Sequence, residues 1–241
     1  MKLAFFSDIH ANLPALEAFF KDLESEDIDA LYCLGDLVGY HVWPNEVVDE
    51  IRKRQIPTIM GNHDEALLTS IDPELQTSNR SLTRSLLNDK NIDYLINLPR
   101  QLSLSFLINN KPFNLLMVHG SVKAIDDYMV QDYPEHEVLN MMQSQQAHLL
   151  LCGHTHIPFH RIIPDGDTFR HVLNIGSVGK PKDADPRAYY AILDIDQSVN
   201  SEPEAIKVRF KRVEYNVEQA AKAIEESEFD NAYAHALRRA R

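Results

Sequence analysis

Five short polar motifs contain the side chains of this chain that are best suited to bind metal ions. The motifs are Asp8-Ile9-His10, Gly35-Asp36, Gly61-Asn62-His63-Asp64, His119-Gly120 and Gly153-His154-Thr155-His156. They combine carboxylates, an amide oxygen and five of the eleven histidines, without a thiolate. This donor set suits Mn²⁺, Fe, Zn²⁺, Co²⁺ or Ni²⁺ better than Ca²⁺ or Mg²⁺ alone. We therefore expect two divalent metal ions, with manganese favoured, because the carboxylate of Asp36 can bridge two ions.

A pair of cations at such a site would favour hydrolysis of phosphate esters. Two ions roughly 3.5–4 Å apart activate a water between them and clamp the oxygens of a phosphoryl group. Asn62 would help to hold these oxygens. A histidine positioned as general acid contributes about 10²–10⁴-fold to the rate. We expect in-line attack by a metal-bridging hydroxide, without a covalent phosphoenzyme.

An apolar run precedes each motif and predicts a buried strand. The runs lie at 3–6, 30–34, 58–60, 115–118 and 149–152. Short continuous apolar runs are typical of buried strands. In open α/β sheets, ligands bind where the carboxyl ends of the strands emerge. The five motifs are therefore expected to meet where their strands end.

The rest of the pattern predicts one α/β domain over residues 1–241. Helices are expected at 16–23, at 45–54 and at 217–224, with two or three more in 65–98 and one within 120–147. Asn12 is a plausible cap of the first helix, with Pro14 in its first turn. Further strands are expected at 102–108, 113–118, 158–163, 169–173, 189–195 and 206–210. Alternation of strand and helix in the first third implies parallel strands. The expected fold is a four-layer αββα sandwich, in which two packed mixed β-sheets are flanked by helices.

The composition of the chain argues against some classes of binding partner. The net charge of −12 argues against non-specific binding of nucleic acid, which needs a basic surface. A phosphorylated substrate is compatible with this charge, because bound cations can invert the local charge of a site. The apolar run at the N-terminus is too short for a signal peptide, and no run has membrane-spanning length. Cys33 and Cys152 lie in apolar runs and are expected to be buried, reduced thiols, which favours a cytoplasmic protein.

The order of the motifs resembles that of the calcineurin-like metallophosphoesterase superfamily. D-x-H, G-D-x-x-G, G-N-H-D, H-G and G-H-x-H follow one another from Asp8 to His156, and the stretch 174–179 extends the match. Within the superfamily, the chain resembles the small bacterial and archaeal phosphodiesterases. Several motifs in order are a far more specific signal than a single one.

The resemblance assigns a role to each motif residue. It implies that the first metal is held by Asp8, His10, Asp36 and His156, and the second by Asp36, Asn62, His119 and His154. His63 would protonate the leaving oxygen, or stabilise charge there, and Asp64 would orient it. The local alternatives are that His63 is only a helix N-terminal residue, and that Asp64 only favours the start of that helix.

Further residues have both a structural and a functional interpretation. Asn12 could assist phosphate binding instead of only capping a helix, and Arg187 could contact phosphate instead of pairing with Asp183 or Asp185. The glycines and serine of 174–179 either present backbone amides to the site or form a tight turn. Aromatic and histidine side chains could edge the cleft and stack on a base, or simply pack in loops: Tyr40, His41, Trp43, Tyr128 and Tyr133. The basic tail at 238–241 is expected to be a solvated helix end, with partner binding as the alternative.

The favoured function is that of a dinuclear metal-dependent phosphodiesterase. The alternatives are a phosphomonoesterase or protein phosphatase, a dinucleoside polyphosphate hydrolase, and a non-catalytic scaffold of the same fold, like the retromer subunit that lacks the catalytic histidine. His63 and the complete ligand set argue against the scaffold. A metallo-β-lactamase-type hydrolase is disfavoured because no His-x-His-x-Asp-His motif occurs. We expect a small phosphorylated substrate, with nucleotides among the candidates, and no membrane partner; a homo-oligomer stays open.

Overall fold

Two mixed β-sheets form the centre of the structure, a computed structural model that describes residues 1–68, 78–108, 110–196 and 206–241. The four-stranded sheet has the order β2-β1-β8-β9. Its strands are β1 (Lys2–Phe6), β2 (Ala30–Cys33), β8 (Ala188–Ile195) and β9 (Ile206–Val213). β1 and β2 are parallel, whereas β8 is antiparallel to both of its neighbours, β1 and β9. The expected parallel pairing in the first third is therefore confirmed for β1 and β2.

The five-stranded sheet has the order β3-β4-β5-β7-β6. Its strands are β3 (Gln101–Ile108), β4 (Lys111–Val118), β5 (Leu149–Cys152), β6 (Phe159–Asp165) and β7 (Thr168–Asn174). The three central strands β4, β5 and β7 are parallel, and the two edge strands are antiparallel to their neighbours. Every strand expected beyond residue 100 is present, with ends that differ by up to three residues.

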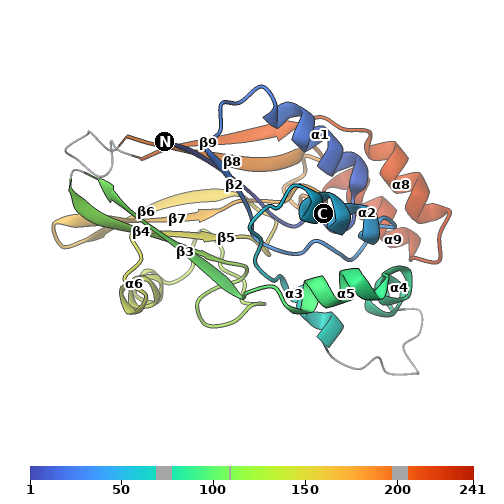
Figure 1. Cartoon of the computed structure of the whole chain (residues 1–241), viewed down its shortest axis with the longest axis horizontal. Helices are drawn as coiled ribbons and strands as arrows, with labels where there is room; N and C mark the ends of the chain where they lie inside the picture. Colours follow the sequence, from blue (N-terminus) through green and yellow to red (C-terminus); the bar gives the residue numbers. More distant parts are fainter. Residues whose placement is uncertain (69–77, 109, 197–205) are drawn as a thin grey trace.

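Alternating side chains of the strands separate the core into layers. Leu3 and Phe5 face the five-stranded sheet, whereas Ala4 and Phe6 pack against helices on the opposite face. Those helices are α1 (Leu13–Leu23), α2 (Pro44–Lys53) and α5 (Asp89–Ile96). Helix α6 (Glu135–Ser144) covers the outer face of the five-stranded sheet (Figure 1). The αββα sandwich is thus confirmed.

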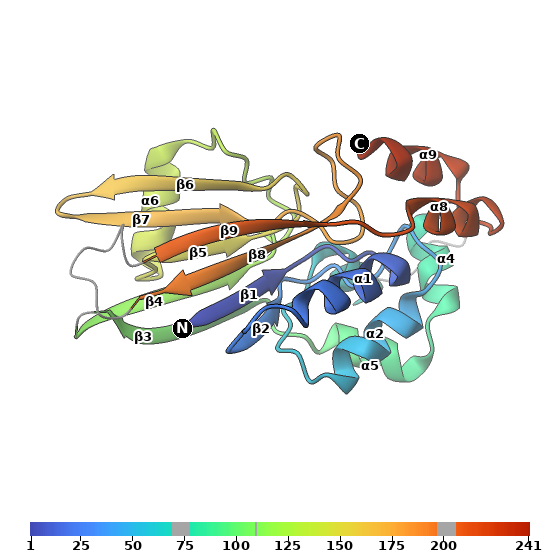
Figure 2. The ribbon, with the colours of Figure 1, turned by 90° about the horizontal axis from the view of Figure 1, so that it is seen from above.

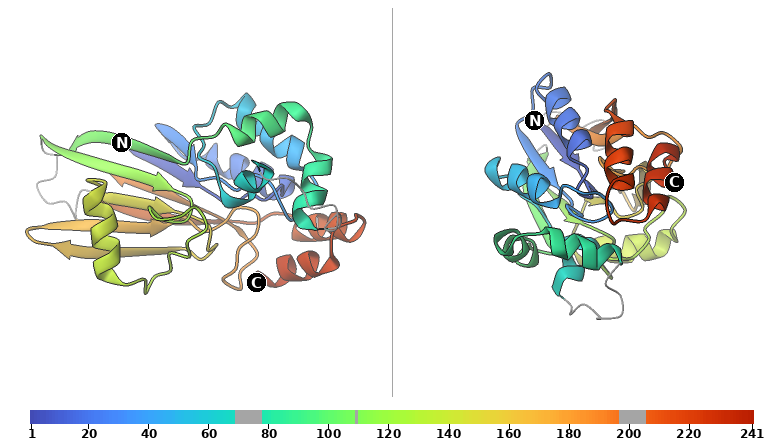
Figure 3. Two further views of the ribbon diagram at one scale, coloured as in Figure 1. Left: turned by 90° about the horizontal axis from the view of Figure 1, so that it is seen from below. Right: turned by 90° about the vertical axis from the view of Figure 1, so that its right-hand side faces the viewer.

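Most helices gather at one end of the sandwich (Figures 2 and 3). Strand β1 points toward this end, so that its carboxyl end leads into the interior of the molecule (Figure 2). The remaining helical elements are α3 (Asn62–Glu65), the 3₁₀ turn η1 (Ala66–Leu68), α4 (Asn79–Leu86), α8 (Val217–Glu225) and α9 (Asn231–Arg239). The helices expected in 65–98 are found as η1, α4 and α5, and residues 69–77 of that range lie outside the described residues.

Two expectations about elements need correction. The strand expected at 58–60 is reduced to a single parallel bridge between Cys33 and Thr58. Pro57 has no backbone N–H to donate to β2 on one side of the bridge, and on the other side the N–H of Gly61 donates to Asp64 Oδ2, so the ladder ends in both directions. The C-terminus has a second helix, α9, because Asp230 accepts the N–H of Ala232 and begins a new helix after α8.

Three smaller expectations, on the cap of α1, the cysteines and the basic tail, are confirmed. The side chain of Asn12 accepts the N–H of Ala15 and caps α1, with Pro14 in the first turn. Cys33 and Cys152 are buried free thiols. The basic tail is the end of α9, where Arg238 pairs with Glu218 and Glu225 of α8. Within the described ranges, no helix is both long and apolar enough to cross a membrane.

Candidate metal centre

The predicted metal ligands meet where strands of both sheets end. Asp8 follows β1, Asp36 follows β2, His119 follows β4 and His154 follows β5. The backbone N–H of His154 donates to Asp8 Oδ2 at 3.1 Å, which joins the two sheets at this point. The expectation that the motifs converge at strand ends is therefore confirmed for these four, whereas Asn62 follows the isolated bridge at Thr58.

Five of the seven predicted ligands have left-handed backbone conformations. The φ angles are 55° for Asp8, 52° for His10, 54° for Asp36, 63° for His154 and 61° for His156. Such angles are uncommon for residues other than glycine and cluster at functional sites, where the surrounding structure enforces them. Here the loops after β1 and β2 enforce them on each other, since Asp8 and His10 donate backbone N–H groups to the carbonyls of Gly35 and Asp36.

The first group of donors is formed by Asp8, His10, Asp36 and His156, whose ligand atoms all lie within 4.8 Å of one another. Nε2 of His156 lies 3.1 Å from Asp8 Oδ1 and 3.0 Å from Nε2 of His10. His10 Nε2 is also 3.6 Å from Asp36 Oδ2. These separations are those of atoms that share one cation.

Backbone carbonyls fix the orientation of three imidazoles. Nδ1 of His10 donates to the Val38 carbonyl at 3.0 Å, that of His119 to Leu34 at 2.7 Å, and that of His156 to Lys180 at 2.5 Å. Each Nε2 therefore directs its lone pair into the cluster, as in metal sites whose ligands are oriented by a second hydrogen bond. Two such lone pairs 3.0 Å apart, on His10 and His156, repel each other unless a proton or a cation lies between them.

The second group contains Asp36, His119 and His154, with Asn62 between them. Asn62 Oδ1 is 3.1 Å from His119 Nε2 and 2.8 Å from His154 Nδ1. Asp36 Oδ2 lies 3.2 Å from His119 Nε2 and belongs to both groups. The geometry thus brings all seven predicted ligands together in two groups that share Asp36.

Buried atoms without hydrogen-bond partners show that a cation fits this site. While the facing imidazole nitrogens carry no proton, Asp8 Oδ1, Asp36 Oδ2 and His154 Nε2 are buried atoms without a hydrogen-bond partner among the described residues. A buried acceptor left unsatisfied costs about 1–3 kcal/mol. A divalent cation next to the two carboxylate oxygens would remove that cost, and the oxygen and nitrogen donor set matches transition metals and zinc.

Charge interactions within the cluster are strong. Burial by itself would raise the pKa of Asp36, but the imidazoles of His119 and His63 outweigh burial and hold this pKa well below its usual value. Burial by itself would lower the pKa of His119, but Asp36 and Asp8 reverse this and raise it to about 10. Without a cation, a proton on His119 balances the carboxylates, and a bound cation would take its place.

His63 lies beside the cluster and belongs to neither ligand group. Its backbone N–H donates to Asp36 Oδ1 at 2.8 Å, and its ring centre lies 4.9 Å from that of His10 and 4.7 Å from that of Tyr40. Burial lowers the pKa of His63. Gly39 permits this position, because a Cβ atom there would lie 2.6 Å from His63 Nδ1. The ring is therefore placed to act next to the metals.

The Asp64 carboxylate binds backbone groups, and its predicted role of orienting His63 stays a prediction. Its carboxylate accepts the backbone N–H groups of Asp36 at 2.9 Å, Leu37 at 3.0 Å and Gly61 at 2.9 Å. With three backbone donors, the carboxylate ties the loop after β2 to the start of α3. Burial, together with Asp36, raises the pKa of Asp64 to about 7. Asp64 thus positions the backbone that carries Asp36, and its recorded contacts do not orient the His63 ring.

The two residues predicted to contact the substrate form hydrogen bonds with other residues of the chain. Asn12 is fully buried, caps α1 and donates its amide to the Gly179 carbonyl at 2.8 Å. Arg187 is exposed and forms two-pronged hydrogen bonds with Asp185. For both residues the observed contacts match the structural interpretation, whereas phosphate contact stays an untested prediction.

The residues predicted to edge the cleft differ in whether they contact the metal-ligand cluster. The Tyr128 ring is 57% exposed and packs edge-on against His154 at 4.5 Å. Tyr40 packs on His10, whereas Trp43 belongs to the apolar cluster of α8 and α9. His41 is buried, with Nδ1 donating to the His10 carbonyl at 2.7 Å. Tyr40 and Tyr128 therefore border the centre.

Hydrogen bonds from residues 174–179 hold the loops that carry the predicted metal ligands. Ser177 Oγ and the Gly179 N–H both donate to the Asp8 carbonyl, at 2.7 and 3.0 Å. Asn174 donates to the Gly153 carbonyl at 2.6 Å and to Thr155 Oγ1 at 3.0 Å. Sequence reasoning missed this role of Asn174 and the Lys180 carbonyl that orients His156, since neither residue type signals such a contact.

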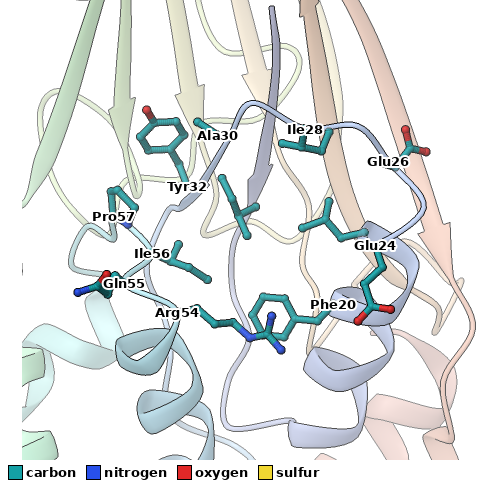
Figure 4. Close-up of a pocket in the computed structure, with 12 residues that line it drawn as sticks. Phe20, Glu24, Glu26, Ile28, Ala30, Tyr32, Arg54, Gln55, Ile56 and Pro57 are labelled. Carbon is teal, nitrogen blue, oxygen red and sulfur yellow. The ribbon is translucent and has the colours of Figure 1, made fainter.

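Two surface cavities differ in their relation to the cluster. One, of about 440 Å³, adjoins the cluster because Asn62 lines it together with Glu65, Arg100 and Asp126. The other, of about 490 Å³, lies between the end of α1, β2 and the loop after α2, where Phe20, Tyr32 and Arg54 line it (Figure 4). None of the predicted ligands lines this second cavity.

Comparison with known proteins agrees with this geometry. The sequence profile of the calcineurin-like phosphoesterase superfamily domain matches residues 1–198. An uncharacterized protein of Methanocaldococcus jannaschii is 30% identical over 239 residues, which cover 92% of this chain and 91% of that protein. A metallophosphoesterase from Sphaerobacter thermophilus is similar in structure, with a TM-score of 0.79 and 29% identity over 100% of both chains. A hypothetical protein from Pyrococcus horikoshii has the same fold, with a TM-score of 0.78 and 23% identity over 100% of this chain and 98% of that one. The chain therefore belongs to the calcineurin-like phosphoesterase superfamily.

Proposed function

We propose that this phosphoesterase is a dinuclear metal-dependent hydrolase of phosphate esters, with phosphodiesters as favoured substrates. The observation that carries the proposal is that Asp36 belongs to both ligand groups. Its buried Oδ2 lies 3.6 Å from His10 Nε2 of the first group and 3.2 Å from His119 Nε2 of the second. A carboxylate in that position is suited to bridge two cations. Manganese stays the favoured ion among those that the donor set admits.

Each residue group would contribute a separate part of the reaction. When bound, the two cations lower the pKa of water and neutralise charge on the phosphoryl oxygens. Asn62, beside His119 and His154, would contact a phosphoryl oxygen and keep it in place. His63 would hold a proton at its ring, next to His10, and deliver it to the leaving oxygen.

The other functions differ in what they require of the site. A phosphomonoesterase, a protein phosphatase or a dinucleoside polyphosphate hydrolase would use the same centre and differ only in the cleft wall. A non-catalytic scaffold does not need His63 beside the cluster, and it gains nothing from strained donors such as Asp8 and His156. These features favour an enzyme.

The test is hydrolysis by manganese-loaded protein of a generic phosphodiester and of its monoester counterpart. We expect turnover of both, with kcat/KM higher for the diester. His63→Ala should lower kcat by about 10²–10⁴-fold while the metal content is unchanged, because His63 is not a ligand. His136→Ala, which removes an exposed histidine on α6, is the matched control and should retain wild-type turnover.

The outcomes separate the alternatives. Failure to hydrolyse either ester with two manganese equivalents bound would leave the scaffold as the better interpretation. A strong preference for the monoester would overturn the phosphodiesterase proposal alone. Loss of metal in His63→Ala would show that the ring acts structurally.

A further inference from the structure

Lys180 is a buried cation without a counter-charge. It is 6% exposed, and in the described part of the chain no carboxylate lies within ion-pairing distance of its ammonium group. Its recorded neighbour is the ring of Tyr40, whose centre lies 4.8 Å from Nζ. Removing an ammonium group from water costs several kcal/mol, and a cation–π contact of about 0.5–2 kcal/mol offsets only part of that cost.

Nearby acids are already paired with other cations. Asp183 forms an ion pair with Arg212, and Asp185 forms one with Arg187. The loop therefore has carboxylates close in sequence to Lys180, and neither neutralises it. An anion from outside the chain would therefore supply the counter-charge that these acids do not.

The position of Lys180 connects it to the proposed reaction. The Tyr40 ring that contacts its ammonium group also packs on His10 at 4.8 Å and on His63 at 4.7 Å. The Lys180 carbonyl accepts the Nδ1 proton of His156. The ammonium group is thus separated by one aromatic ring from the histidine that would protonate the leaving oxygen.

Lys182 adds a second positive charge on the same loop. It is half-buried, and its backbone N–H donates to the His156 carbonyl at 3.4 Å. Burial lowers the pKa of Lys182, while Asp8 and Asp36 oppose the shift. Two lysines thus flank the centre on the side of His156.

We propose that Lys180 and Lys182, with Tyr40 as a wall, form a subsite for a second phosphoryl group of the substrate. This inference rests on the proposed function and names its substrate class: phosphate esters with an adjacent phosphoryl group, such as nucleoside diphosphates and polyphosphates. A phosphoryl group offers several anionic oxygens, which two ammonium groups can contact together. The net charge of −12 disfavours long polyanions, so the positive charge acts only locally.

Binding of AMP and ADP, measured by calorimetry, tests the subsite. The two ligands share a nucleoside and differ by the second phosphoryl group. Measurements on metal-free and on manganese-loaded protein at fixed free metal separate the lysine contribution from that of the cations. A charge-assisted hydrogen bond contributes about 1.5–3 kcal/mol, so ADP should bind at least about tenfold more tightly than AMP in both states.

Two variants test the residues. Lys180→Met and Lys182→Met should each bring the ratio of AMP to ADP dissociation constants down to within about threefold of one, since each removes an ammonium group from the subsite. Lys53→Met removes the same charge from an exposed side chain on α2 and should leave the wild-type ratio. Lys182 is less buried than Lys180, so its variant gives an answer even where Lys180→Met does not fold.

Three outcomes overturn the inference. One is a wild-type ratio near one in the metal-free protein, and another is an unchanged ratio in both folded variants. The third is a gain in affinity from methyl phosphate to phosphoglycolate that equals the gain from AMP to ADP. This result would assign the subsite to a carboxylate. Binding in the metal-free protein does not depend on catalysis, so absence of hydrolysis with a normal ADP preference would refute only the proposed function.

Discussion

Two pairs of histidines in this molecule have nearly the same spacing and different surroundings. Ring nitrogens of His10 and His156 lie 3.0 Å apart in the metal centre, and those of His160 and His171 lie 3.1 Å apart on β6 and β7. The first pair sits in loops with positive φ angles, next to Asp8 and Asp36. The second sits in regular strands, and no carboxylate is found within ion-pairing distance of it among the described residues.

The difference shows which feature distinguishes a site from a packed pair. In the second pair, Nε2 of His160 meets Nδ1 of His171, and one proton between them satisfies both atoms. In the first pair, both Nδ1 protons go to backbone carbonyls, so the facing nitrogens have no proton to share. Carboxylates and an enforced backbone, rather than the proximity of two histidines, therefore identify the metal centre.

Asp36→Asn should have the largest effect, because it removes the charge from the oxygen shared by both ligand groups. Losing only the hydrogen-bond partner of a metal ligand typically lowers metal affinity by 10–100-fold. Losing the bridging charge should therefore lower affinity at least about 100-fold and reduce turnover with it. Metal analysis after dialysis, combined with the phosphodiester assay, measures both effects.

The second histidine pair supplies the control. His171→Phe should retain wild-type metal content and turnover, because β7 carries this ring away from every ligand group. Equal metal loss in the two variants would contradict the contrast between the pairs.

Gly39→Ala sharpens the comparison by disturbing the centre without touching a ligand. Gly39 has a φ of +98°, and the added Cβ would lie 2.6 Å from His63 Nδ1. A displaced His63 should lower kcat about tenfold or more, since small misplacements of catalytic groups are costly. Metal content should stay constant, and thermal unfolding should show a loss of about 1 kcal/mol or more from the strained backbone.

Gly166→Ala separates strain from displacement. Gly166 also has a positive φ, of 62°, but a Cβ there would meet no atom within 4 Å. The variant should lose stability to a similar extent and keep its turnover. Equal kcat in the two glycine variants would show that the close approach to His63 has no catalytic consequence.

The metal centre could be predicted from the sequence because its ligands lie directly at strand ends. The apolar runs before Asp8, His119 and His154 are long enough to predict strands, and parallel strands bring their carboxyl ends together. Asp36 follows the same rule after β2. Residue type and position therefore sufficed to assemble the ligands.

The supporting contacts could not be predicted, because backbone groups make them. Asp64 binds three backbone N–H groups, and the carbonyls of Leu34, Val38 and Lys180 orient three imidazoles. Every residue has such groups, so no side-chain pattern marks them. The strand expected at 58–60 failed for a different reason: its apolar pattern was correct, but Pro57 lacks the N–H that would extend the single bridge between Cys33 and Thr58.

The last prediction tests the contrast between the two histidine pairs through stability at low pH. It is the prediction with the smallest expected effect on activity. Burial, with His160 nearby, lowers the pKa of His171 to about 4. In the unfolded chain a histidine titrates near 6.5, so between these values the unfolded state binds the proton and the folded state does not. His171 therefore makes the free energy of unfolding fall as the pH drops from about 6.5 to 4, by up to about 3 kcal/mol.

His171→Phe should remove this dependence while the histidines of the metal centre titrate alike in both proteins. The stability of the variant relative to the wild type should thus improve steadily as the pH falls from 7 to 4, measured by urea unfolding of metal-free protein. Near pH 7 the two should differ by about 1 kcal/mol or less, because the change removes one hydrogen bond and one unpartnered buried nitrogen together. A difference that does not vary with pH would mean that the His160–His171 pair takes up its proton in the folded state. Its resemblance to the pair in the metal centre would then extend beyond spacing.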